Sequence, residues 1–319
     1  MDVVSDAISA VHLGHPWSHR LRMSGSWRTR QDPYDGAGFY VVLKGHGWLL
    51  SDGGAPVSLG VGDAVLLPHG TGHVIADSPV DAAIAAETAV PFEQWLAETG
   101  QRERSDRTET EMLCGTYWLD CSRMHPLMAE LPEVVHLPHR VGSHVELRAA
   151  IDLLAGELDE RRPGSCIALP NLLDLLLVYM IRSWMTETSG GAWPGALGDP
   201  VTASALRAMH SNPGAPWSVD RLAAEAGVSR PTLARRFATL VGRPPMAYLT
   251  WWRVILAATL LRDTPDTLAT IAGRVGYGSP YAFERELGTT PGRYRAQAAD
   301  RSASVTGPRP TSRTHRQTH

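Results

Sequence analysis

Two stretches near the C-terminus of this 319-residue chain resemble one another, and this repeat constrains the fold more than any other feature. Residues 222–229 match residues 271–279, with one extra residue in the second copy. The repeat predicts two copies of one small structural unit. The corresponding pairs are Ser229 and Ser279, Leu233 and Phe283, Arg235 and Arg285 and, further on, Gly242 and Gly288, Pro245 and Pro291, Tyr248 and Tyr294.

Each copy reads as a short helix, a glycine turn and a second helix. A glycine accepts the positive φ that a tight turn needs, a serine caps the second helix, and a proline is harmless in its first turn. This pattern is typical of a helix-turn-helix, whose second helix enters the major groove of DNA. A helical repeat that only packs against its neighbours is the alternative. The residues concerned are Gly227 and Gly276, Ser229 and Ser279, and Pro231 and Pro280.

Charge is unevenly distributed along the chain, although the net charge is only −3. Residues 1–199 carry 14 basic and 26 acidic side chains, whereas residues 200–295 carry 12 basic and 6 acidic ones. A basic C-terminal part favours a polyanion as its partner. Ordinary variation of surface charge is the alternative explanation on this observation alone.

Length and composition exclude several classes of protein. The chain is long enough for two domains of about 150 residues. We find no apolar run as long as a membrane span, which needs about 20 residues, and no signal peptide. Three cysteines are too few for a disulfide scaffold, and an odd count suits a reducing compartment. We therefore expect a cytoplasmic protein with no membrane partner.

The stretch 217–295 resembles the DNA-binding domain of the AraC/XylS family of transcription regulators. Several separate motifs occur in the order that this family has, which makes the resemblance specific. It implies two helix-turn-helix units on one connecting helix. The segments that carry it are 217–223 (WSVDRLA), 226–229 (AGVS), 233–237 (LARRF), 242–249 (GRPPMAYL), 260–262 (LLR), 271–277 and 288–295 (GTTPGRYR).

By position, the resemblance assigns DNA contacts to both units. Arg235 and Arg285 are the candidates for base readout, because a guanidinium can bind guanine O6 and N7 with two hydrogen bonds. Arg236 and Arg243 are expected to meet phosphates, which position a protein without specifying a sequence. For any single arginine, a solvated helix face is the alternative. The remaining candidates are Arg230, Pro231 and Ala234 in the first unit, and Pro280 and Tyr281 in the second.

The second unit departs from the family pattern. Four residues separate Phe237 from Gly242, whereas none separates Leu287 from Gly288. Four residues make about one helical turn, roughly 6 Å. The second recognition helix, around 280–287, is therefore expected to be short, and Glu284 and Glu286 would disfavour phosphate. Our hypothesis is that the second unit binds DNA weakly or not at all.

The acidic front half reads as short strands separated by glycine and aspartate turns. The expected strands include residues 39–43, 48–50, 57–59 and 64–67, which suggests an antiparallel sandwich or barrel. Residues 62–73 (GDAVLLPHGTGH) resemble the second motif of cupin β-barrels. The whole chain then resembles AraC-type regulators that carry an N-terminal cupin sensor.

A metal-dependent cupin enzyme is the main rival interpretation. Metal-binding cupins carry an H-x-H pair and a carboxylate before the second motif. Residues 31–40 (QDPYDGAGFY) contain no histidine and therefore no H-x-H pair. His73 would be a lone ligand, whereas imidazole sites need several converging ligands. We therefore predict no metal, no cofactor and no catalytic residue. A second rival is a regulator that has lost DNA binding and acts through heterodimers.

A barrel of this kind can also enclose a small molecule. The candidate lining is Trp27, Phe39, Tyr40, Trp48 and His73, although aromatic side chains in a barrel can simply form its core. Cys114 is the candidate for an oxidation-sensitive thiol, with a buried inert thiol as the alternative.

Two helices are expected between the barrel and the repeat. Residues 145–161 place apolar side chains on one stripe, whereas residues 169–186 are apolar on several sides and need cover from a second subunit or from a monomeric core. Residues 190–195 (GGAWPG) read as a linker. The predicted segments are a cupin-like sensor barrel (1–140), a helical dimerisation or linker region (141–195), an AraC-type DNA-binding domain (196–298) and a disordered tail (299–319).

The fold expected is thus multidomain, with an all-β barrel and following helices in front of an all-α domain of two helix-turn-helix units. The expected function is a sequence-specific transcription regulator controlled through its cupin domain. Double-stranded promoter DNA is the main expected partner, and the chain is expected to form a homodimer. RNA polymerase and a small-molecule effector are candidate partners.

Overall fold

The computed structural model describes residues 2–52, 54–99, 109–119, 124–159, 162–188, 191–277, 290 and 292–296. These residues fall into two compact units. The first contains residues 1–212 and 217–248, and the second contains residues 213–216 and the chain from 249 onward. The chain therefore crosses between units within one long helix.

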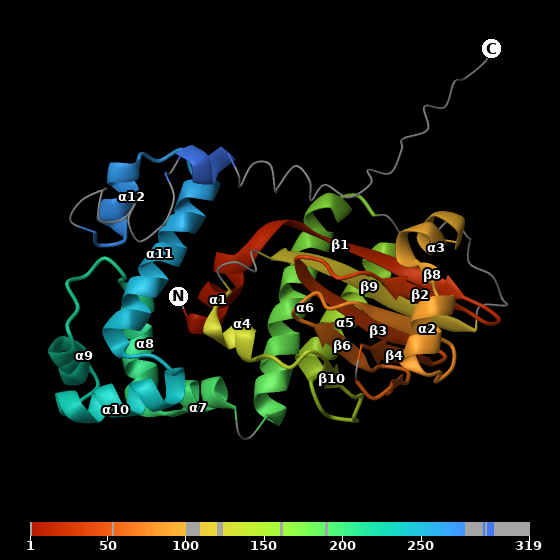
Figure 1. Cartoon of the computed structure of the whole chain (residues 1–319), viewed down its shortest axis with the longest axis horizontal. Helices are drawn as coiled ribbons and strands as arrows, with labels where there is room; N and C mark the ends of the chain where they lie inside the picture. The colour runs from red at the N-terminus through yellow and green to blue at the C-terminus, as the bar shows by residue number, and fades with distance from the viewer. Residues whose placement is uncertain are drawn as a thin grey trace, which may run out of the picture. The chain divides into compact units, whose positions relative to one another are not determined.

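Two five-stranded sheets form the β-sandwich of the first unit (Figure 1). All pairings are antiparallel except that of the short β8 with β2. In spatial order the sheets are β1 (His12–Met23), β9 (Thr110–Leu119), β3 (Gly36–Lys44), β6 (Ala64–Leu67), β10 (Val135–Leu137), and β5 (Val57–Leu59), β4 (Gly47–Ser51), β7 (His73–Ala76), β2 (Arg28–Gln31), β8 (Val90–Pro91).

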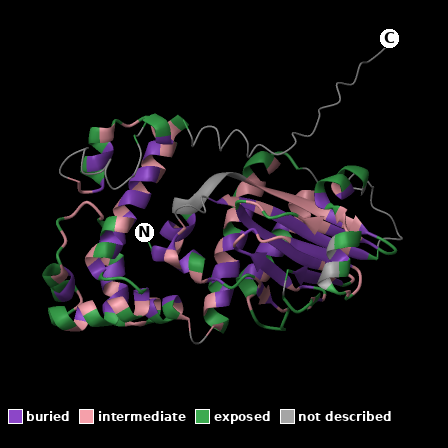
Figure 2. Ribbon diagram, in the orientation of Figure 1, coloured by how far each residue is buried: buried purple, intermediate pink, exposed green. Residues whose placement is uncertain are grey.

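The core of the sandwich lies between the two sheets, where successive residues of a strand point to opposite faces. Tyr40 and Val42 of β3 face the same cluster as Met112 and Cys114 of β9. Leu49 of β4 and Ile75 of β7 meet them from the other sheet. Figure 2 shows these strands coloured almost throughout as buried. The four strand segments expected from the sequence are confirmed as parts of β3, β4, β5 and β6.

Ten helices of the described part belong wholly to the first unit. The front of the chain is not composed only of strands, because α1 precedes β1 and α2 and α3 follow β7. The helices are α1 (Val3–Val11), α2 (Ala82–Thr88), α3 (Phe92–Thr99), α4 (Pro126–Glu130), α5 (Val145–Asp159), α6 (Ser165–Glu187), α7 (Ala192–Gly198), α8 (Pro200–Ser211), α9 (Val219–Glu225) and α10 (Arg230–Val241).

The helices α5 and α6 pack on the first sheet through polar contacts at their inner sides. Arg22 Nη2 lies 2.7 Å from Asp159 Oδ1 at the end of α5, and its Nε lies 2.9 Å from Glu111 Oε1 of β9. Tyr117 of β9 donates its hydroxyl proton to the Leu173 carbonyl of α6 at 2.6 Å. These contacts hold α5 and α6 against the first sheet of the sandwich.

One described helix, α6, is long and apolar enough to cross a membrane by length and composition alone. The expectation that the chain contains no such stretch was therefore wrong. A core helix of a soluble protein can have the same length and composition. Ile167 and Leu175 are the large apolar side chains of α6 that are exposed in the described chain, whereas Leu173, Leu176, Leu177, Met180 and Ile181 are buried.

The expected linker at residues 190–195 is also wrong, because α7 begins at Ala192. Gly191 takes the N-cap position with an extended backbone, and Trp193 is buried. Burial of one large aromatic side chain stabilises this helix by about 2 kcal/mol relative to an exposed position. A segment with several glycines and a proline is folded here by tertiary packing.

The long helix α11 (Pro245–Asp263) passes from the first unit into the second, where α12 (Leu268–Arg274) follows. Val254, Ala258 and Leu261 of α11 form a buried cluster with Ile271 of α12 and with Tyr294. Gly276 has a φ of +82°, and a side chain there would collide with the backbone of Gly214. The turn after α12 therefore requires glycine, as the repeat predicts.

Candidate nucleic-acid interface

The first repeat folds as the predicted helix, turn and helix. Gly227 has a φ of +66° in the turn after α9, which an L-amino acid rarely adopts. Ser229 is the N-cap of α10, and its hydroxyl accepts a hydrogen bond from the Thr232 amide. Pro231 lies in the first turn, and Gly242 ends the helix with a φ of +76°. The local sequence thus fixes both ends of α10.

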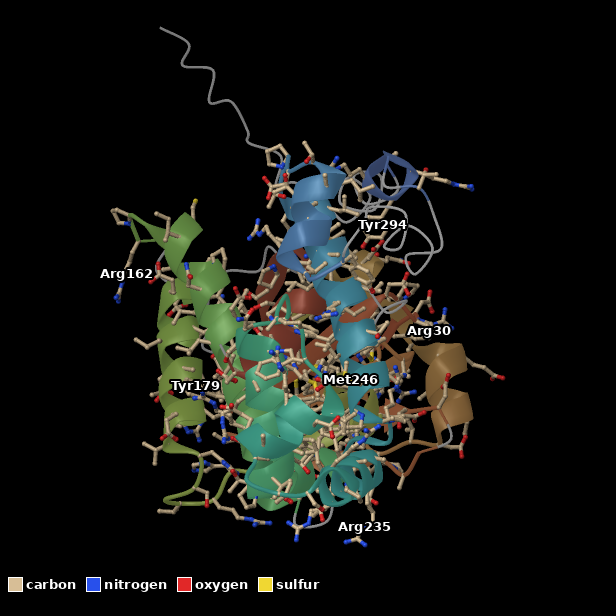
Figure 3. The ribbon with its side chains drawn as sticks, turned by 90° about the vertical axis from the view of Figure 1, so that its left-hand side faces the viewer. Arg30, Arg162, Tyr179, Arg235, Met246 and Tyr294 are labelled. Atoms are coloured by element: carbon tan, nitrogen blue, oxygen red, sulfur yellow. The ribbon has the colours of Figure 1, made fainter. Side chains whose placement is uncertain are left out.

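One side of α10 is buried and the other is open. Leu233, Phe237 and Val241, four residues apart, form the buried side. Pro231, Arg235 and Arg236 are exposed, and Ala234 is half-buried. Figure 3 shows the Arg235 side chain extending away from the ribbon. The structure therefore places these candidates of the first helix-turn-helix on an accessible helix face.

Two of these arginines have carboxylate partners that the sequence did not reveal. Arg230 Nη1 lies 3.4 Å from Asp220 Oδ2 of α9, and Arg236 Nη1 lies 3.5 Å from Asp199 Oδ2. Asp199 also caps α8 through a hydrogen bond from the Val201 amide. The Arg230–Asp220 pair is exposed on both sides, and such surface ion pairs contribute little stability, roughly 0–1 kcal/mol. Arg243, in the turn before α11, is exposed as well.

The second helix-turn-helix is described only in part. Its first helix is α12, capped by Thr267, and its glycine turn is Gly276. Pro280, Tyr281 and Arg285, the predicted DNA contacts of this unit, lie outside the described residues. So do residues 280–287, where the second recognition helix was expected to be short, and residues 299–319, which were expected to be disordered. The hypothesis about the second unit remains a prediction.

The five expected pocket residues do not share one space, and this part of the sequence interpretation was wrong. Trp27, Tyr40 and His73 face the interior between the sheets. Phe39, the neighbour of Tyr40 on β3, points to the opposite face, where it packs on Tyr117 at a ring distance of 5.7 Å. Trp48 packs with a small outer cluster that contains Leu50 and Val74. Strand alternation separates the two sets.

His73 is a structural histidine of the interior. Its Nδ1 donates to the Thr71 carbonyl at 2.9 Å, so its Nε2 accepts the Tyr40 hydroxyl proton at 2.9 Å. Burial lowers the pKa of His73 to about 4, against the hydrogen bond to Thr71, which raises it. Among the described residues, no group of three or more histidine, cysteine or carboxylate side chains is arranged to hold a metal ion.

Cys114 does not have the properties of a redox sensor. Its side chain is buried in the sandwich core. Burial raises the pKa of the Cys114 thiol well above its usual range, so almost no reactive thiolate forms near neutral pH. The proposal of an oxidation-sensitive Cys114 is therefore contradicted, and the alternative of an inert core thiol holds.

A surface pocket of about 590 Å³ opens at one end of the sandwich, and sequence analysis did not find it. It is formed by the loops before β3, after β4 and after β6, together with Glu133. Its lining offers carboxylates and hydroxyl groups rather than the expected aromatic set. The polar lining residues are Tyr34, Asp35, Ser51, Asp52, His69, Thr71 and Glu133.

A cupin-type sandwich followed by helix-turn-helix elements is the domain composition of a DNA-binding transcription regulator. Family models agree with this class: a cupin model matches residues 2–186, and a helix-turn-helix domain model matches residues 222–297. The second match confirms that the C-terminal repeat is of the helix-turn-helix type. The first covers more than half of the chain.

The similar proteins carry regulator names. A putative AraC-like transcription regulator from Streptomyces lividans is 33% identical over 92% of this chain and 98% of its own length. The HTH-type transcriptional regulator AlkR from Acinetobacter baylyi is 26% identical over 93% of this chain and 100% of its own. The crystal structure of the AdpA DNA-binding domain with a target DNA is 36% identical over 33% of this chain and 96% of that chain, with a TM-score of 0.30.

The chain therefore belongs to the AraC-like transcription regulators and carries an N-terminal cupin domain. This confirms the resemblance and the fold class inferred from the sequence. The relatives are named regulators, which indicates a role other than catalysis, and the alternative of a cupin enzyme finds no support.

Proposed function

We propose that this protein is a sequence-specific transcription regulator that reads promoter DNA chiefly with α10. The exposed face of α10, which carries Arg235 opposite the buried Leu233 and Phe237, is the observation that supports this proposal most directly. Arg235 contacts a base in the major groove, Arg230 lies beside it at the start of α10, and Arg236 and Arg243 meet phosphates. The second helix-turn-helix adds little to the affinity for DNA.

A salt series on the protein's own upstream DNA tests this function. Two phosphate contacts per protomer, from Arg236 and Arg243, predict that log affinity falls against log salt with a slope of about −1.8 per protomer. A gel-shift titration at several salt concentrations, with unrelated DNA as competitor, measures both the slope and the sequence preference. Binding that ignores sequence, or that does not change with salt, would contradict the proposal.

The homodimer is the second part of the proposal, and α6 is its interface. Ile167 and Leu175 of α6 lie eight residues apart on one stripe, and their side chains are 73% and 38% exposed. A second copy of the chain would cover this stripe and place two α10 helices on two half-sites. Promoter DNA, RNA polymerase at the promoter and a cytoplasmic location complete the proposed setting.

Charge on this stripe is expected to separate the protomers. The double variant Ile167→Glu with Leu175→Glu should elute and scatter light as a monomer, because two carboxylates would be desolvated in the interface. Ile84→Glu is the matched control, since Ile84 of α2 is also exposed, at 55%, but lies on the sandwich. The control should keep the mass of the wild type. Equal masses for all three proteins would remove α6 from the interface.

The pocket at the end of the sandwich is the proposed effector site. Its volume of about 590 Å³ suits a small molecule, and Asp35, Asp52 and Glu133 in its lining favour a ligand with hydrogen-bond donors. Tyr34 lines the pocket and also packs over Gly36 and Gly38 of β3. A ligand in the pocket would therefore act on β3 through Tyr34. The effector shifts the population of DNA-binding arrangements.

A further inference from the structure

The pocket at the end of the sandwich contains two hydroxyl groups that have no partner in the described chain. Ser51 ends β4 and is only 6% exposed, yet its hydroxyl forms no hydrogen bond with another described residue. The Thr71 hydroxyl oxygen is also buried and unpaired among the described residues. Both residues line the pocket. Because an unpaired polar group in a buried place is unfavourable, these hydroxyl groups favour a hydrogen-bonding molecule in the pocket.

A histidine adds a third polar group to this lining. His69 Nε2 lies 2.7 Å from the Leu131 carbonyl oxygen. A carbonyl oxygen can only accept a hydrogen bond, so Nε2 carries the proton and Nδ1 of the neutral ring is left as an acceptor. His69 is half-buried and forms no other hydrogen bond with a described residue. The Leu131 carbonyl thus holds the ring in the form that accepts a hydrogen bond from a ligand.

The pocket is also strongly negative. Three loops each supply one carboxylate to its lining, namely Asp35 before β3, Asp52 after β4 and Glu133 before β10. None of the three forms an ion pair with another described residue, and the described lining contains no lysine or arginine. A concave surface lined by charges of one sign concentrates ions of the opposite sign. The lining therefore favours a cation over a neutral molecule or an anion.

The arrangement of these carboxylates separates an organic cation from a metal ion. A metal ion needs several ligand atoms that converge on one point. Among the described residues, no three histidine, cysteine or carboxylate side chains are arranged in this way. The negative charge is instead spread around a space of about 590 Å³, which is large enough for a small organic molecule. Positive charges that are separated along a molecule match this distribution.

We propose that the pocket binds a small organic cation with two or more ammonium groups. Asp35, Asp52 and Glu133 hold its charges, and the hydroxyl groups of Ser51 and Thr71 accept hydrogen bonds from it. An ammonium group has three N–H donors and no acceptor, so it complements a lining composed mainly of acceptors. This inference rests on the proposed role of the pocket as the effector site and names the class of effector.

A short series of contacts joins the pocket to α6, the proposed dimer interface. The Tyr34 ring in the pocket wall meets the Trp118 ring of β9 edge-on, at a centroid distance of 6.0 Å. Tyr117, the preceding residue of β9, donates its hydroxyl proton to the Leu173 carbonyl of α6 at 2.6 Å. A cation that displaces or fixes Tyr34 therefore acts on α6 through β9.

Calorimetry on the full-length chain without DNA tests the ligand class. The probes are 1,4-diaminobutane, 1,6-diaminohexane and 1,8-diaminooctane, each compared with the diol of the same length. We expect at least one diamine to bind with one site per chain and about 5- to 25-fold tighter than its diol, as one or two charge pairs predict. If no diamine binds better than its diol, the proposal is overturned. Displacement of the diamine by stoichiometric Mg²⁺ would also overturn it, because the site would then be a metal site.

Carboxylate variants locate the binding. Asp35→Asn, Asp52→Asn and Glu133→Gln should each weaken binding of the diamine by up to about fivefold. Asp32→Asn is the matched control, because Asp32 is an exposed carboxylate of the same loop as Asp35 but does not line the pocket. The control should bind as the wild type does. A loss for Asp32→Asn equal to those of the lining variants would show attraction to the acidic surface in general and would overturn the site.

Thr71→Val separates ligand binding from stability. The substitution removes the unpaired hydroxyl and keeps the Thr71 carbonyl, which accepts the hydrogen bond of His73. We expect the free energy of unfolding in urea to stay at the wild-type value or rise, because no hydrogen bond within the described chain is lost. Affinity for the diamine should fall about 2- to 10-fold. Unchanged affinity would overturn the contact assigned to Thr71.

DNA titrations relate the site to regulation. The diamine should change the affinity of the wild type for its upstream DNA, and the change should be smaller for Asp52→Asn at the same diamine concentration. This comparison subtracts any direct effect of the diamine on DNA. An equal response of the two proteins would contradict the effector role, whereas calorimetry decides the cation site independently. Absence of sequence-selective DNA binding without diamine would contradict the proposed function of α10 instead.

Discussion

Replacement of Arg235 by alanine is expected to reduce affinity for the promoter between about 5-fold and about 150-fold, the range that corresponds to about 1–3 kcal/mol for a bidentate base contact. Arg235 lies near the middle of the open face of α10, two residues after the buried Leu233. Its side chain packs on no core cluster of the described residues, so its removal should leave the fold intact. The loss should thus come from the DNA contact.

Two other substitutions separate base recognition from charge. Arg207→Ala removes an exposed arginine that lies on α8 rather than on the recognition helix α10, and it should change affinity little. Arg236→Ala should reduce the salt slope by about one unit and weaken binding to all sequences alike, as expected for a phosphate contact. Only Arg235→Ala should relax the preference for the promoter over unrelated DNA. A uniform loss across sequences for Arg235→Ala would make it a phosphate contact.

Arg285→Ala provides the comparison with the second unit. The recognition helix of that unit is expected to be a turn shorter, and Glu284 and Glu286 flank the arginine in the sequence. We therefore expect Arg285→Ala to lose clearly less affinity than Arg235→Ala. Fluorescence anisotropy with one labelled operator measures both. Equal losses would refute the hypothesis that the first unit dominates.

Local signals were sufficient to predict the first helix-turn-helix unit. Ser229, Gly227 and Gly242 act through the backbone of their own segment, as a cap and as positions with positive φ. Apolar residues at four-residue spacing then decide which side of α10 is buried. The strands of the sandwich were predicted for the same reason, since turn residues and β-prone runs are read over a few positions.

The residues that were missed depend on contacts between distant parts of the chain. Asp6 and His210, whose side chains lie 2.8 Å apart, are separated by 204 positions, and neither stands in a recognisable motif. Residues 190–195 were expected to form a linker, but α7 begins at Ala192 because Trp193 is buried beside the His125 ring. The error on Phe39 was avoidable, because adjacent residues of one strand cannot line the same interior.

His73 makes the stability of the sandwich dependent on pH. Its neutral ring satisfies both the Thr71 carbonyl and the Tyr40 hydroxyl inside a core where an imidazolium would be desolvated. The pKa of His73 is lowered to about 4 in the fold and returns to its ordinary value of 6.5 on unfolding. The unfolded chain therefore takes up a proton first as the pH falls. Stability is complete above pH 6.5 and decreases between about pH 6.5 and pH 4.

This difference predicts a loss of about 3 kcal/mol from His73 over that range, at about 1.36 kcal/mol per pH unit. The double variant Tyr40→Phe with His73→Leu replaces both partners by apolar groups, so it should keep most of its stability at pH 7.5. It should then lose about 3 kcal/mol less than the wild type by pH 4 in urea titrations followed by circular dichroism. His46→Ala, at an exposed histidine, should retain the wild-type pH profile. If the double variant and the wild type lose the same free energy of unfolding on acidification, His73 is protonated in the fold and the neutral pair with Tyr40 does not exist.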